Sequence, residues 1–338
     1  MIKKIVLTGG PSSGKTTIIK KLRENLEGQG YNVICISETA SELINAHFIP
    51  YGKTEYVLKF QELVLKQQSS KEKNYEKMVE DTSNKDTIII YDRAILDNRA
   101  YLDNQKDFDY LLGKNSLSEI TISDKYDLVI DLVTAANLGK DEYEENGIRY
   151  EDIEGAKKTD IKTTIAWLLA PNLIVVKPEK NFENKVNKVI HIVNNHLKGG
   201  ELQEKVSYPL DEEQTDLSMY NDDNSKKVYI TDYHLANINP YTSNKVTKRE
   251  YKGYDSYVYK SVETSDDKKQ TNKYLIDALR FNELINSNWV LCENNYTELN
   301  FINDNQDIFK IVYKDNEDAK LICNRDSEIP KNVIIKKK

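Results

Sequence analysis

The stretch Gly9-Gly10-Pro11-Ser12-Ser13-Gly14-Lys15-Thr16-Thr17 decides the fold of the first half of this chain. It has a glycine, four further residues and then Gly-Lys-Thr, and it lies between the apolar run Ile5–Leu7 and an amphipathic stretch. Glycines permit the positive φ angles that turn successive amides inward, and a helix N-terminus adds about half a positive charge. The sequence therefore predicts a loop that binds the phosphates of a nucleoside triphosphate.

Two side chains of this loop have expected roles in the chemistry. The Lys15 ammonium would bridge the β- and γ-phosphates, and the Thr16 hydroxyl would hold Mg²⁺. The alternative is a glycine turn with an exposed lysine, which the spacing and the strand–helix context disfavour. The residues predicted to contact the nucleotide are Gly9, Gly10, Pro11, Ser12, Ser13, Gly14, Lys15, Thr16 and Thr17.

Short apolar runs alternate with helical patterns along the first two hundred residues. Runs nearly continuous in Ile, Val and Leu are typical of strands covered on both faces, so the order predicts a parallel α/β sheet with right-handed crossovers. The predicted strands are Lys4–Thr8, Asn32–Ser37, Thr87–Tyr91, Leu128–Val133 and Leu173–Val176. The predicted helices include Lys15–Leu26, Glu55–Glu80, Asp152–Leu169 and Phe182–Leu197.

The pattern changes after an acid-rich, polar segment at 199–225, which we interpret as a linker between a domain at 1–198 and another at 226–338. Residues 227–259 alternate like strands around a turn at Lys252–Asp255, and a helix is expected over Lys269–Ile285. Further strands separated by Asn/Asp turns are expected at Trp289–Cys292, Glu298–Ile302, Phe309–Tyr313 and Lys320–Cys323. The second half is thus predicted to be an antiparallel α+β domain.

Composition narrows the classes of function. The net charge of -7 disfavours a dedicated duplex-binding protein, which would need a broad basic face. The three cysteines have neither metal-binding nor redox spacing, which favours a reducing, cytoplasmic setting. No apolar run reaches the length of a membrane-spanning helix, and no signal peptide is evident.

Asp92 and Arg93 follow an apolar strand and are candidate catalytic residues. The end of a parallel strand faces the nucleotide, so Asp92 could bind Mg²⁺ through water or accept a proton. Arg93 offers a planar donor fork to a phosphate or carboxylate, and Asp97 could orient it. The alternative makes Asp92 a helix cap and Arg93 a surface ion-pair residue.

Glu38 and Arg149 are two further candidates. Glu38 ends the second strand, where it could accept a proton from a substrate hydroxyl or, equally well, cap the next helix. Arg149 lies in a charged loop where a lid could bring a cation to the transferring phosphate; the alternative is an exposed helix start.

Several segments together resemble a known family, the P-loop ATPase/kinase-like domains of the AAA_28 type, to which a nicotinamide-riboside-kinase domain is related. The matching segments span about residues 3–195 and include Ser37–Ala40, Tyr91–Arg93, Asp127–Leu132 and Asn181–Lys185. The resemblance implies nucleotide and catalytic roles for Lys15, Thr16, Asp92, Arg93 and Arg149. It also implies that Asn181 and Phe182 lie near the base.

The layout of the whole chain resembles a narrower group, in which such a domain precedes a CYTH-like, triphosphate-tunnel domain, as in the TRP-like translocation defect proteins. That group is associated with GTP binding. The family's Glu-x-Glu-x-Lys is absent, because Val228–Tyr233 offers a single acid, which disfavours a two-metal triphosphatase site. An anion-binding or structural module is expected instead. Its candidate anion-binding residues are Lys248, Arg249, Tyr257, Lys260 and Arg280.

The sequence leaves more than one function open. One hypothesis is Mg²⁺-dependent phosphoryl transfer from ATP or GTP to an unknown acceptor, or slow hydrolysis. A second is a nucleotide-dependent switch, in which the CYTH-like domain binds a phosphorylated ligand or a partner. A third is binding of polyphosphate, RNA 5′ ends or anionic lipid by a basic hairpin, Lys248–Tyr251 with Tyr257–Lys260, and by the Lys336–Lys338 tail. The choice of base and the oligomeric state stay open.

Overall fold

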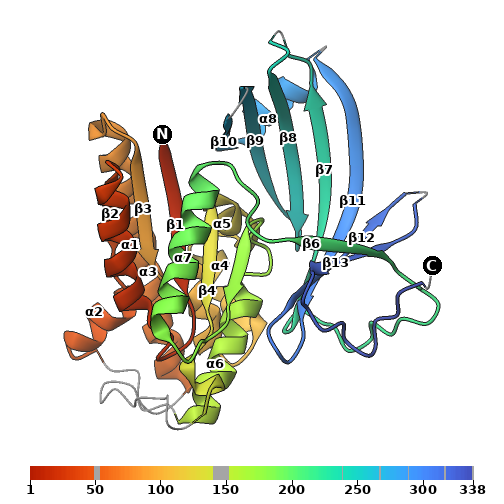
Figure 1. Cartoon of the computed structure of the whole chain (residues 1–338). Helices are drawn as coiled ribbons and strands as arrows, with labels where there is room; N and C mark the ends of the chain where they lie inside the picture. The colour runs from red at the N-terminus through yellow and green to blue at the C-terminus, as the bar shows by residue number, and fades with distance from the viewer. Residues whose placement is uncertain are drawn as a thin grey trace. The chain divides into compact units, whose positions relative to one another are not determined.

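The computed structural model describes residues 1–48, 54–139, 152–237, 239–265, 268–287, 289–315 and 317–336. The chain divides into two compact units (Figure 1). The first unit consists of Met1–Ser118 and Tyr126–His191, and the second of Glu119–Lys125 and Ile192–Lys338. Among the helices of the described residues, none combines the length and the hydropathy that a membrane crossing requires.

The first unit is built on a five-stranded parallel sheet with the strand order β2-β3-β1-β4-β5. The strands are β1 (Ile2–Thr8), β2 (Asn32–Ile36), β3 (Thr87–Asp92), β4 (Leu128–Leu132) and β5 (Leu173–Val176). The central strands are buried along their length, as the unbroken apolar runs predicted. The predicted parallel α/β fold is confirmed.

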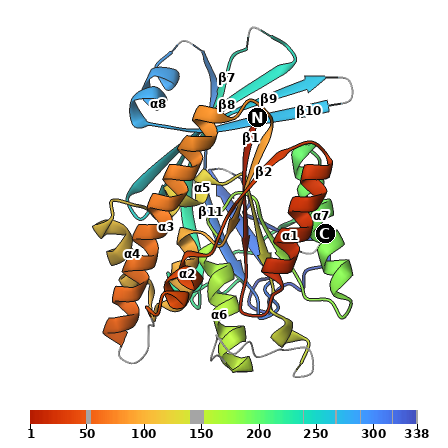
Figure 2. The same cartoon turned by 90° about the vertical axis from the view of Figure 1, so that its left-hand side faces the viewer.

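Helices cover both faces of this sheet. Figure 2 shows α1 and α7 on one face and α3 on the other. The helical segments of the unit are α1 (Lys15–Gly28), α2 (Thr39–Asn45), α3 (Thr54–Thr82), η1 (Ile95–Tyr101), α4 (Gln105–Lys114), η2 (Ala135–Asn137), α6 (Ile153–Ala166) and α7 (Phe182–Leu197). The apolar stripe of α1, at Ile18, Leu22 and Leu26, is fully buried, which accounts for its amphipathic pattern.

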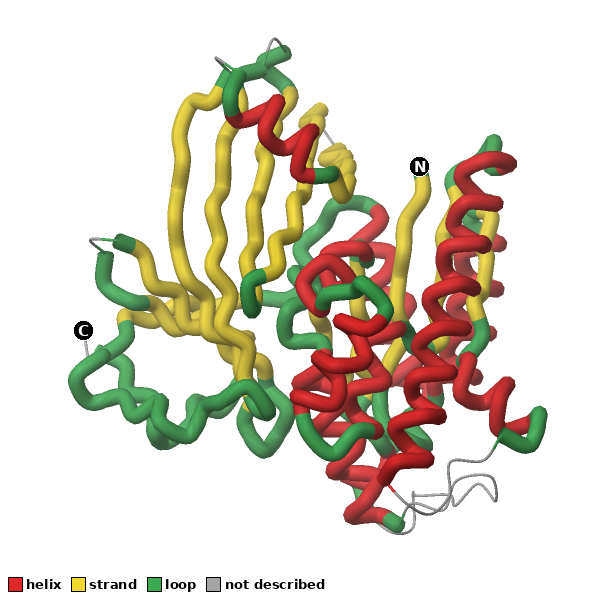
Figure 3. The backbone as a smooth tube through the Cα atoms, turned by 180° about the vertical axis from the view of Figure 1, so that it is seen from behind, coloured by secondary structure: helices red, strands yellow, loops and turns green. Residues whose placement is uncertain are grey.

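The second unit contains an eight-stranded antiparallel sheet with the order β10-β9-β8-β7-β11-β12-β13-β6. Figure 3 shows the strands in yellow. Its strands are β6 (Lys205–Pro209), β7 (Ser225–Leu235), β8 (Thr242–Tyr251), β9 (Tyr254–Ser265), β10 (Lys268–Ile276), β11 (Val290–Ile302), β12 (Ile308–Lys314) and β13 (Lys320–Asn324). Two helices, α5 (Glu119–Lys125) and α8 (Ala278–Ile285), complete the unit. This sheet confirms the predicted antiparallel α+β class.

Two details of the predicted second half are wrong. The expected helix over Lys269–Ile285 begins only at Ala278, because Lys268–Ile276 forms β10 and pairs with β9 in continuous register. The apolar residues of the expected helix lie partly in β10 and partly in α8, and their spacing across that junction resembles one face of a helix. The expected turn near Asn294 is also absent, since Asn294 and Asn295 pair with β7 inside the continuous strand β11.

The expected linker at 199–225 contributes to the second sheet. Residues Lys205–Pro209 form the edge strand β6, which pairs antiparallel with β13. Leu210 is buried in a core with Phe301, Phe309 and Leu321. A polar segment can form such a strand because its partner, more than a hundred residues away, supplies the hydrogen bonds and the apolar face.

The helix α5 belongs to the second unit, although its sequence lies between α4 and β4 of the first. Glu119 of α5 pairs with Lys226 at 3.0 Å, and both side chains are almost completely buried. Asp124 forms a second buried ion pair, with Arg249 of β8. Buried charges require such partners, because an unpaired charge in the interior is costly.

Candidate functional site

The Gly9–Thr17 loop connects β1 to α1 in a conformation that only small residues allow. Gly9 and Gly14 have φ angles of 133° and 86°, and Ser12 also has a positive φ of 53°. A Cβ on Gly9 would lie 2.1 Å from the carbonyl oxygen of Leu132. A Cβ on Gly14 would lie 2.4 Å from the Phe182 ring. Backbone geometry and close packing therefore both require glycine at these two positions.

Three consecutive carbonyl groups of the loop accept hydrogen bonds from the segment after β4 and from α7. The bonds run from Thr134 Oγ1 to the Pro11 carbonyl (2.6 Å), from Ala135 N to the Ser12 carbonyl (3.4 Å) and from Lys185 Nζ to the Ser13 carbonyl (2.9 Å). In a trans peptide the N–H points opposite to the C=O of the same plane. The amides of residues 12–14 therefore turn toward the other side, as a phosphate-binding cradle requires.

Lys15, the first residue of α1, is buried with its ammonium group against the loop. Its Nζ donates to the carbonyl oxygens of Gly9 (2.8 Å) and Gly10 (2.9 Å) and to Ser13 Oγ (3.0 Å). Thr16 and Thr17 are exposed at the first turn of α1. The loop thus presents a cation, a helix N-terminus and two hydroxyl groups together, which is the chemistry that a triphosphate tail needs.

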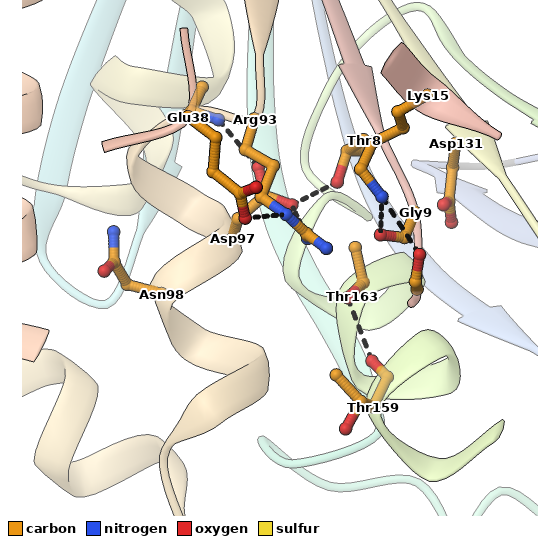
Figure 4. A network of polar contacts seen from close by, with 12 residues as sticks. Thr8, Gly9, Lys15, Glu38, Arg93, Asp97, Asn98, Asp131, Thr159 and Thr163 are labelled. Atoms are coloured by element: carbon orange, nitrogen blue, oxygen red, sulfur yellow. Dashed lines mark hydrogen bonds and ion pairs between the residues drawn. The ribbon is translucent and has the colours of Figure 1, made fainter. Parts of the chain in front are cut away.

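A second polar group gathers Glu38, Arg93 and Asp97 from three different segments (Figure 4). Arg93 Nε lies 2.8 Å from Glu38 Oε1, and its Nη1 lies 3.4 Å from Asp97 Oδ1. Asp97 also accepts hydrogen bonds from Thr8 Oγ1 and from the Ala94 amide. Because Thr8 immediately precedes the glycine loop, this group lies at the same sheet edge as the loop.

Arg93 is a buried cation in a left-handed backbone conformation, with a φ of 64°. Burial opposes its charge, but the neighbouring Tyr101, Glu38 and Asp97 outweigh this and raise the pKa of Arg93. Burial also raises the pKa of Asp97, against the opposing effect of Arg93. Neither Arg93 nor Asp97 is a surface residue, contrary to the alternative considered for Arg93.

Glu38 stands at the N-cap position of α2, but its side chain makes no capping hydrogen bond. Its Oε2 accepts instead from Ser41 Oγ at 2.7 Å, while Oε1 faces Arg93. The Glu38 side chain therefore does not cap α2, which was the alternative considered from the sequence. Asp92 ends β3, where it is paired in register with Leu7 of β1.

Two buried carboxyl groups lie behind the loop, Asp131 at the end of β4 and Asp160 on α6. Asp160 accepts hydrogen bonds from the amides of Gly10 (2.6 Å) and Thr134 (3.2 Å). Asp131 accepts from Thr164 Oγ1 at 2.5 Å. Burial and the neighbouring Asp160 raise the pKa of Asp131 to about 8, so the pair holds a proton at neutral pH.

The remaining candidates of the first unit lie near the loop or outside the described residues. The Phe182 ring packs over Gly14, and Asn181 Oδ1 accepts from the Glu183 amide at 3.0 Å at the start of α7. The expected contact of these two residues with the base stays a prediction. Arg149 and its proposed lid lie within 140–151, outside the residues that the structure describes.

The structure does not gather the five candidate anion-binding residues of the second unit on one face. Strand residues alternate between faces, so Lys248 and its cross-strand neighbour Tyr257 face opposite to Arg249 and Lys260. Lys248 pairs with Asp255 at 3.0 Å, and Tyr257 stacks on Phe281. Arg249 is buried against Asp124, whereas Arg280 is exposed on α8 beside Glu283.

The residues near the loop fit a magnesium ion held mainly through the nucleotide. Mg²⁺ keeps several waters and usually takes only one or two protein ligands together with substrate phosphates. Thr16 at the start of α1 supplies a hydroxyl, and Asp92 at the end of β3 supplies a carboxylate. Across the described residues, no group of three or more His, Cys, Asp or Glu side chains forms a ready-made metal cage.

Three buried residues at or behind the loop were not assigned a role from the sequence: Asp131, Asp160 and Lys185. Asp131 and Lys185 fall within segments that resemble the family, Asp127–Leu132 and Asn181–Lys185, which was the available signal. Asp160 gave no comparable signal, because it is one of several charged and polar residues in α6. Only the tertiary structure brings these three side chains to the loop.

The fold and the loop define a P-loop nucleotide-binding domain, and comparison with known families agrees. Residues 4–185 match the family model described as AAA domain, AAA_28. This match spans more than half of the chain, and the protein belongs to that family. The predicted P-loop domain of the AAA_28 type is thereby confirmed, and membership implies that the chain binds a nucleotide.

Comparison with solved structures gives weak likenesses. The inorganic triphosphatase NE1496 is 11% identical, with a TM-score of 0.27 over 37% of this chain and 75% of that protein. The PH1819 protein of Pyrococcus horikoshii is 8% identical, with a TM-score of 0.27 over 37% of this chain and 79% of that one. No curated protein is significantly similar in sequence.

Proposed function

We propose that the first unit binds a magnesium–nucleoside triphosphate and transfers its terminal phosphoryl group to a hydroxyl acceptor. One observation carries this proposal. The carbonyls of residues 11–13 accept hydrogen bonds from the segment after β4 and from α7, so the amides of residues 12–14 point to the opposite side. Cradle amides with a lysine at a helix start are suited to binding the β- and γ-phosphates.

The group around Glu38 supplies the acceptor side of the proposed reaction. Glu38 is a carboxylate at the same sheet edge, with one oxygen on Arg93 and the other on Ser41. In this role it accepts the proton of the attacking hydroxyl, while Arg93 holds it in place. Asp92 and Thr16 would hold Mg²⁺, which neutralises charge on the phosphates. Arg149 is proposed to add a second cation.

A two-step experiment tests this function. Thermal shifts with Mg-ATP and Mg-GTP, compared with their diphosphates, would first identify the nucleotide that the intact chain prefers. A panel of nucleosides, sugars and polynucleotide 5′-hydroxyls would then be assayed for acceptor-dependent formation of diphosphate. We expect Lys15→Ala to abolish both signals, and Glu38→Gln to abolish transfer while binding persists. Transfer to no acceptor, with slow hydrolysis alone, would contradict the kinase reading and favour a nucleotide switch.

A second candidate function, anion binding by the second unit, is favoured by one feature of its sheet. Lys245, Lys260 and Lys273 lie directly opposite one another on β8, β9 and β10, in a single cross-strand row. Three ammonium groups aligned across neighbouring strands create a local positive potential that favours an anionic ligand. Lys245 also has an acidic neighbour, since its Nζ lies 2.8 Å from Asp232 Oδ2.

The lysine row can be tested with inorganic tripolyphosphate as the probe. Binding should weaken with rising salt and should be lost when Lys260 and Lys273 are both changed to Gln. Lys248 and Lys252 lie outside this row, so a variant with both changed to Gln is the matched control. Equal binding by both double variants would exclude the row as an anion site.

A further inference from the structure

The glycine loop is held from behind by an acid and a base on two different helices. Asp160 of α6 accepts from the amides of Gly10 and Thr134. Lys185 of α7 donates to the carbonyls of Ser13 (2.9 Å) and Val133 (2.8 Å). Each side chain thus bridges one residue of the loop to one residue of the segment that follows β4. We call Asp160 and Lys185 the loop clamp.

The Asp160 half of the clamp fixes the direction of the first peptide plane in the loop. The Gly10 N–H points to Asp160, so the Gly9 carbonyl in the same plane must point the opposite way. That carbonyl oxygen lies 2.8 Å from Lys15 Nζ. Asp160 therefore helps to place the ammonium group that is expected to contact the phosphates.

The Lys185 half fixes the last peptide plane. Its bond to the Ser13 carbonyl turns the Gly14 N–H to the opposite side, at the point where α1 begins. Gly14 also has a positive φ of 86°, a conformation in which the plane could otherwise rotate at little cost. Lys185 therefore restrains the most adaptable amide of the cradle.

The clamp carries a cost that a purely structural contact would not need. Lys185 is only 3% exposed, and burial lowers its pKa to about 8, although Asp160, Asp131 and Glu179 act in the opposite direction. A buried methionine of similar length would pack without this penalty. Methionine, however, could not donate to the Ser13 and Val133 carbonyls, which Lys185 holds in one direction.

We propose that Asp160 and Lys185 are positioning residues that preorganise the cradle amides for the β- and γ-phosphates of the nucleotide. The inference rests on the proposed nucleotide binding and deepens it. It differs from a general role in stability, because it predicts a selective loss. Affinity for a triphosphate should fall, whereas affinity for the matching monophosphate, which lacks those two phosphates, should change little.

The test measures dissociation constants of the intact chain for Mg-ATP, Mg-GTP, AMP and GMP by calorimetry. We expect Lys185→Met to weaken binding of the preferred triphosphate by roughly 10- to 100-fold, the range for loss of a charged hydrogen bond. Lys185→Arg, which keeps the charged donors, should recover most of this loss. Asp160→Asn removes one acceptor and should weaken triphosphate binding in the same direction. Lys188→Met, at an exposed site on the same helix, is the control.

The outcomes separate the clamp from the function on which it rests. Equal losses of triphosphate and monophosphate affinity, or no loss in Lys185→Met, would overturn the clamp while nucleotide binding stands. If the unaltered chain and Lys15→Ala alike bind none of the nucleotides, the proposed function fails and the clamp fails with it. If circular dichroism shows that Lys185→Met does not fold, Lys185→Arg and Asp160→Asn test the clamp instead. The quantity compared is again the affinity for the triphosphate relative to that for the monophosphate.

Discussion

Arg93 Nε lies 2.8 Å from Glu38 Oε1, and both side chains are largely buried. The pair connects the residue after β3 to the residue before α2, two positions that are 55 residues apart in the sequence. Asp97 approaches the same guanidinium from η1. One cation therefore keeps two carboxylates in place at the carboxyl edge of the sheet.

Removal of the Arg93 charge should be strongly destabilising. Arg93→Met leaves the carboxylates of Glu38 and Asp97 without their shared buried cation, which typically costs about 3–5 kcal/mol. Urea unfolding would measure this loss as a lower midpoint at neutral pH. Arg23→Met, which breaks an exposed ion pair with Glu27, should have no measurable effect. Equal midpoints for the two variants would contradict the buried pairing.

Asp131→Asn should stabilise the protein increasingly as pH rises. The folded chain keeps a proton on Asp131 up to about pH 8, whereas an ordinary aspartate releases it near 3.8. Between these values the folded state binds more protons than the unfolded state, so the contribution of this group falls as pH rises, by at most about 1.4 kcal/mol per pH unit. Asparagine does not titrate and can still accept from Thr164.

Thermal unfolding of the unaltered chain and of Asp131→Asn from pH 5 to pH 8.5 checks this sign. The difference in midpoint should grow in favour of the variant across that range. The exposed Asp81→Asn should show no such trend. A constant difference, or one that shrinks with pH, would mean that Asp131 is ionised in the folded protein.

Alanine at the loop glycines should be damaging in a defined order. Gly9→Ala places a methyl group 2.1 Å from the Leu132 carbonyl at a φ of +133°, so the backbone itself must shift. We expect a loss of more than about 2 kcal/mol. Gly14→Ala meets the partly exposed Phe182 ring, which can move aside, so its cost should be smaller.

Gly28→Ala is the matched control for the loop glycines. Gly28 is the last residue of α1, and an added Cβ there would meet nothing within 4 Å. Alanine should therefore be neutral or stabilise by up to about 1 kcal/mol. Urea midpoints of the three variants test the order; a Gly9→Ala protein as stable as Gly28→Ala would exclude the described loop geometry.

A fragment of residues 1–198 should be unstable unless the two buried acids of α5 are replaced by neutral residues. This fragment retains Glu119 and Asp124 but lacks Lys226 and Arg249, their buried partners. Changing the two acids to Gln and Asn should therefore raise the thermal midpoint of the fragment, because neutral groups are easier to leave without partners. The same changes in the full chain should lower its midpoint. The change in thermal midpoint should therefore have opposite signs in the fragment and in the full chain; equal signs would contradict the buried pairing of α5.

The first sheet was predictable because its information is local. Each of its strands is an almost unbroken apolar run, and the Gly9–Thr17 pattern fixes the turn between β1 and α1. The helix starts at Lys15 and Phe182 were also correct, since glycine or asparagine precedes each amphipathic stretch.

The parts that were missed depend on partners far away in the sequence. The edge strand β6 acquires its structure from β13, more than a hundred residues away, so its polar sequence does not look like a strand on its own. The missed strand β10 is a different case, because its partner β9 directly precedes it and its apolar residues continue into α8. Anion-binding candidates chosen as near neighbours, such as Lys248 and Arg249, necessarily faced opposite sides of a sheet. The inward role of Asp160 depends on the close approach of α6 to Gly10, 150 residues earlier.

The buried pairs of α5 also impose an order on synthesis of the chain. Asp124 is made 125 residues before Arg249, its partner, which corresponds to roughly 6 to 25 s at ribosomal rates of about 5–20 residues per second. At the start of that interval the strands that will supply the buried partners of α5 have not been synthesised. The nascent chain can therefore bury Asp124 against Arg249 only after translation has passed β8.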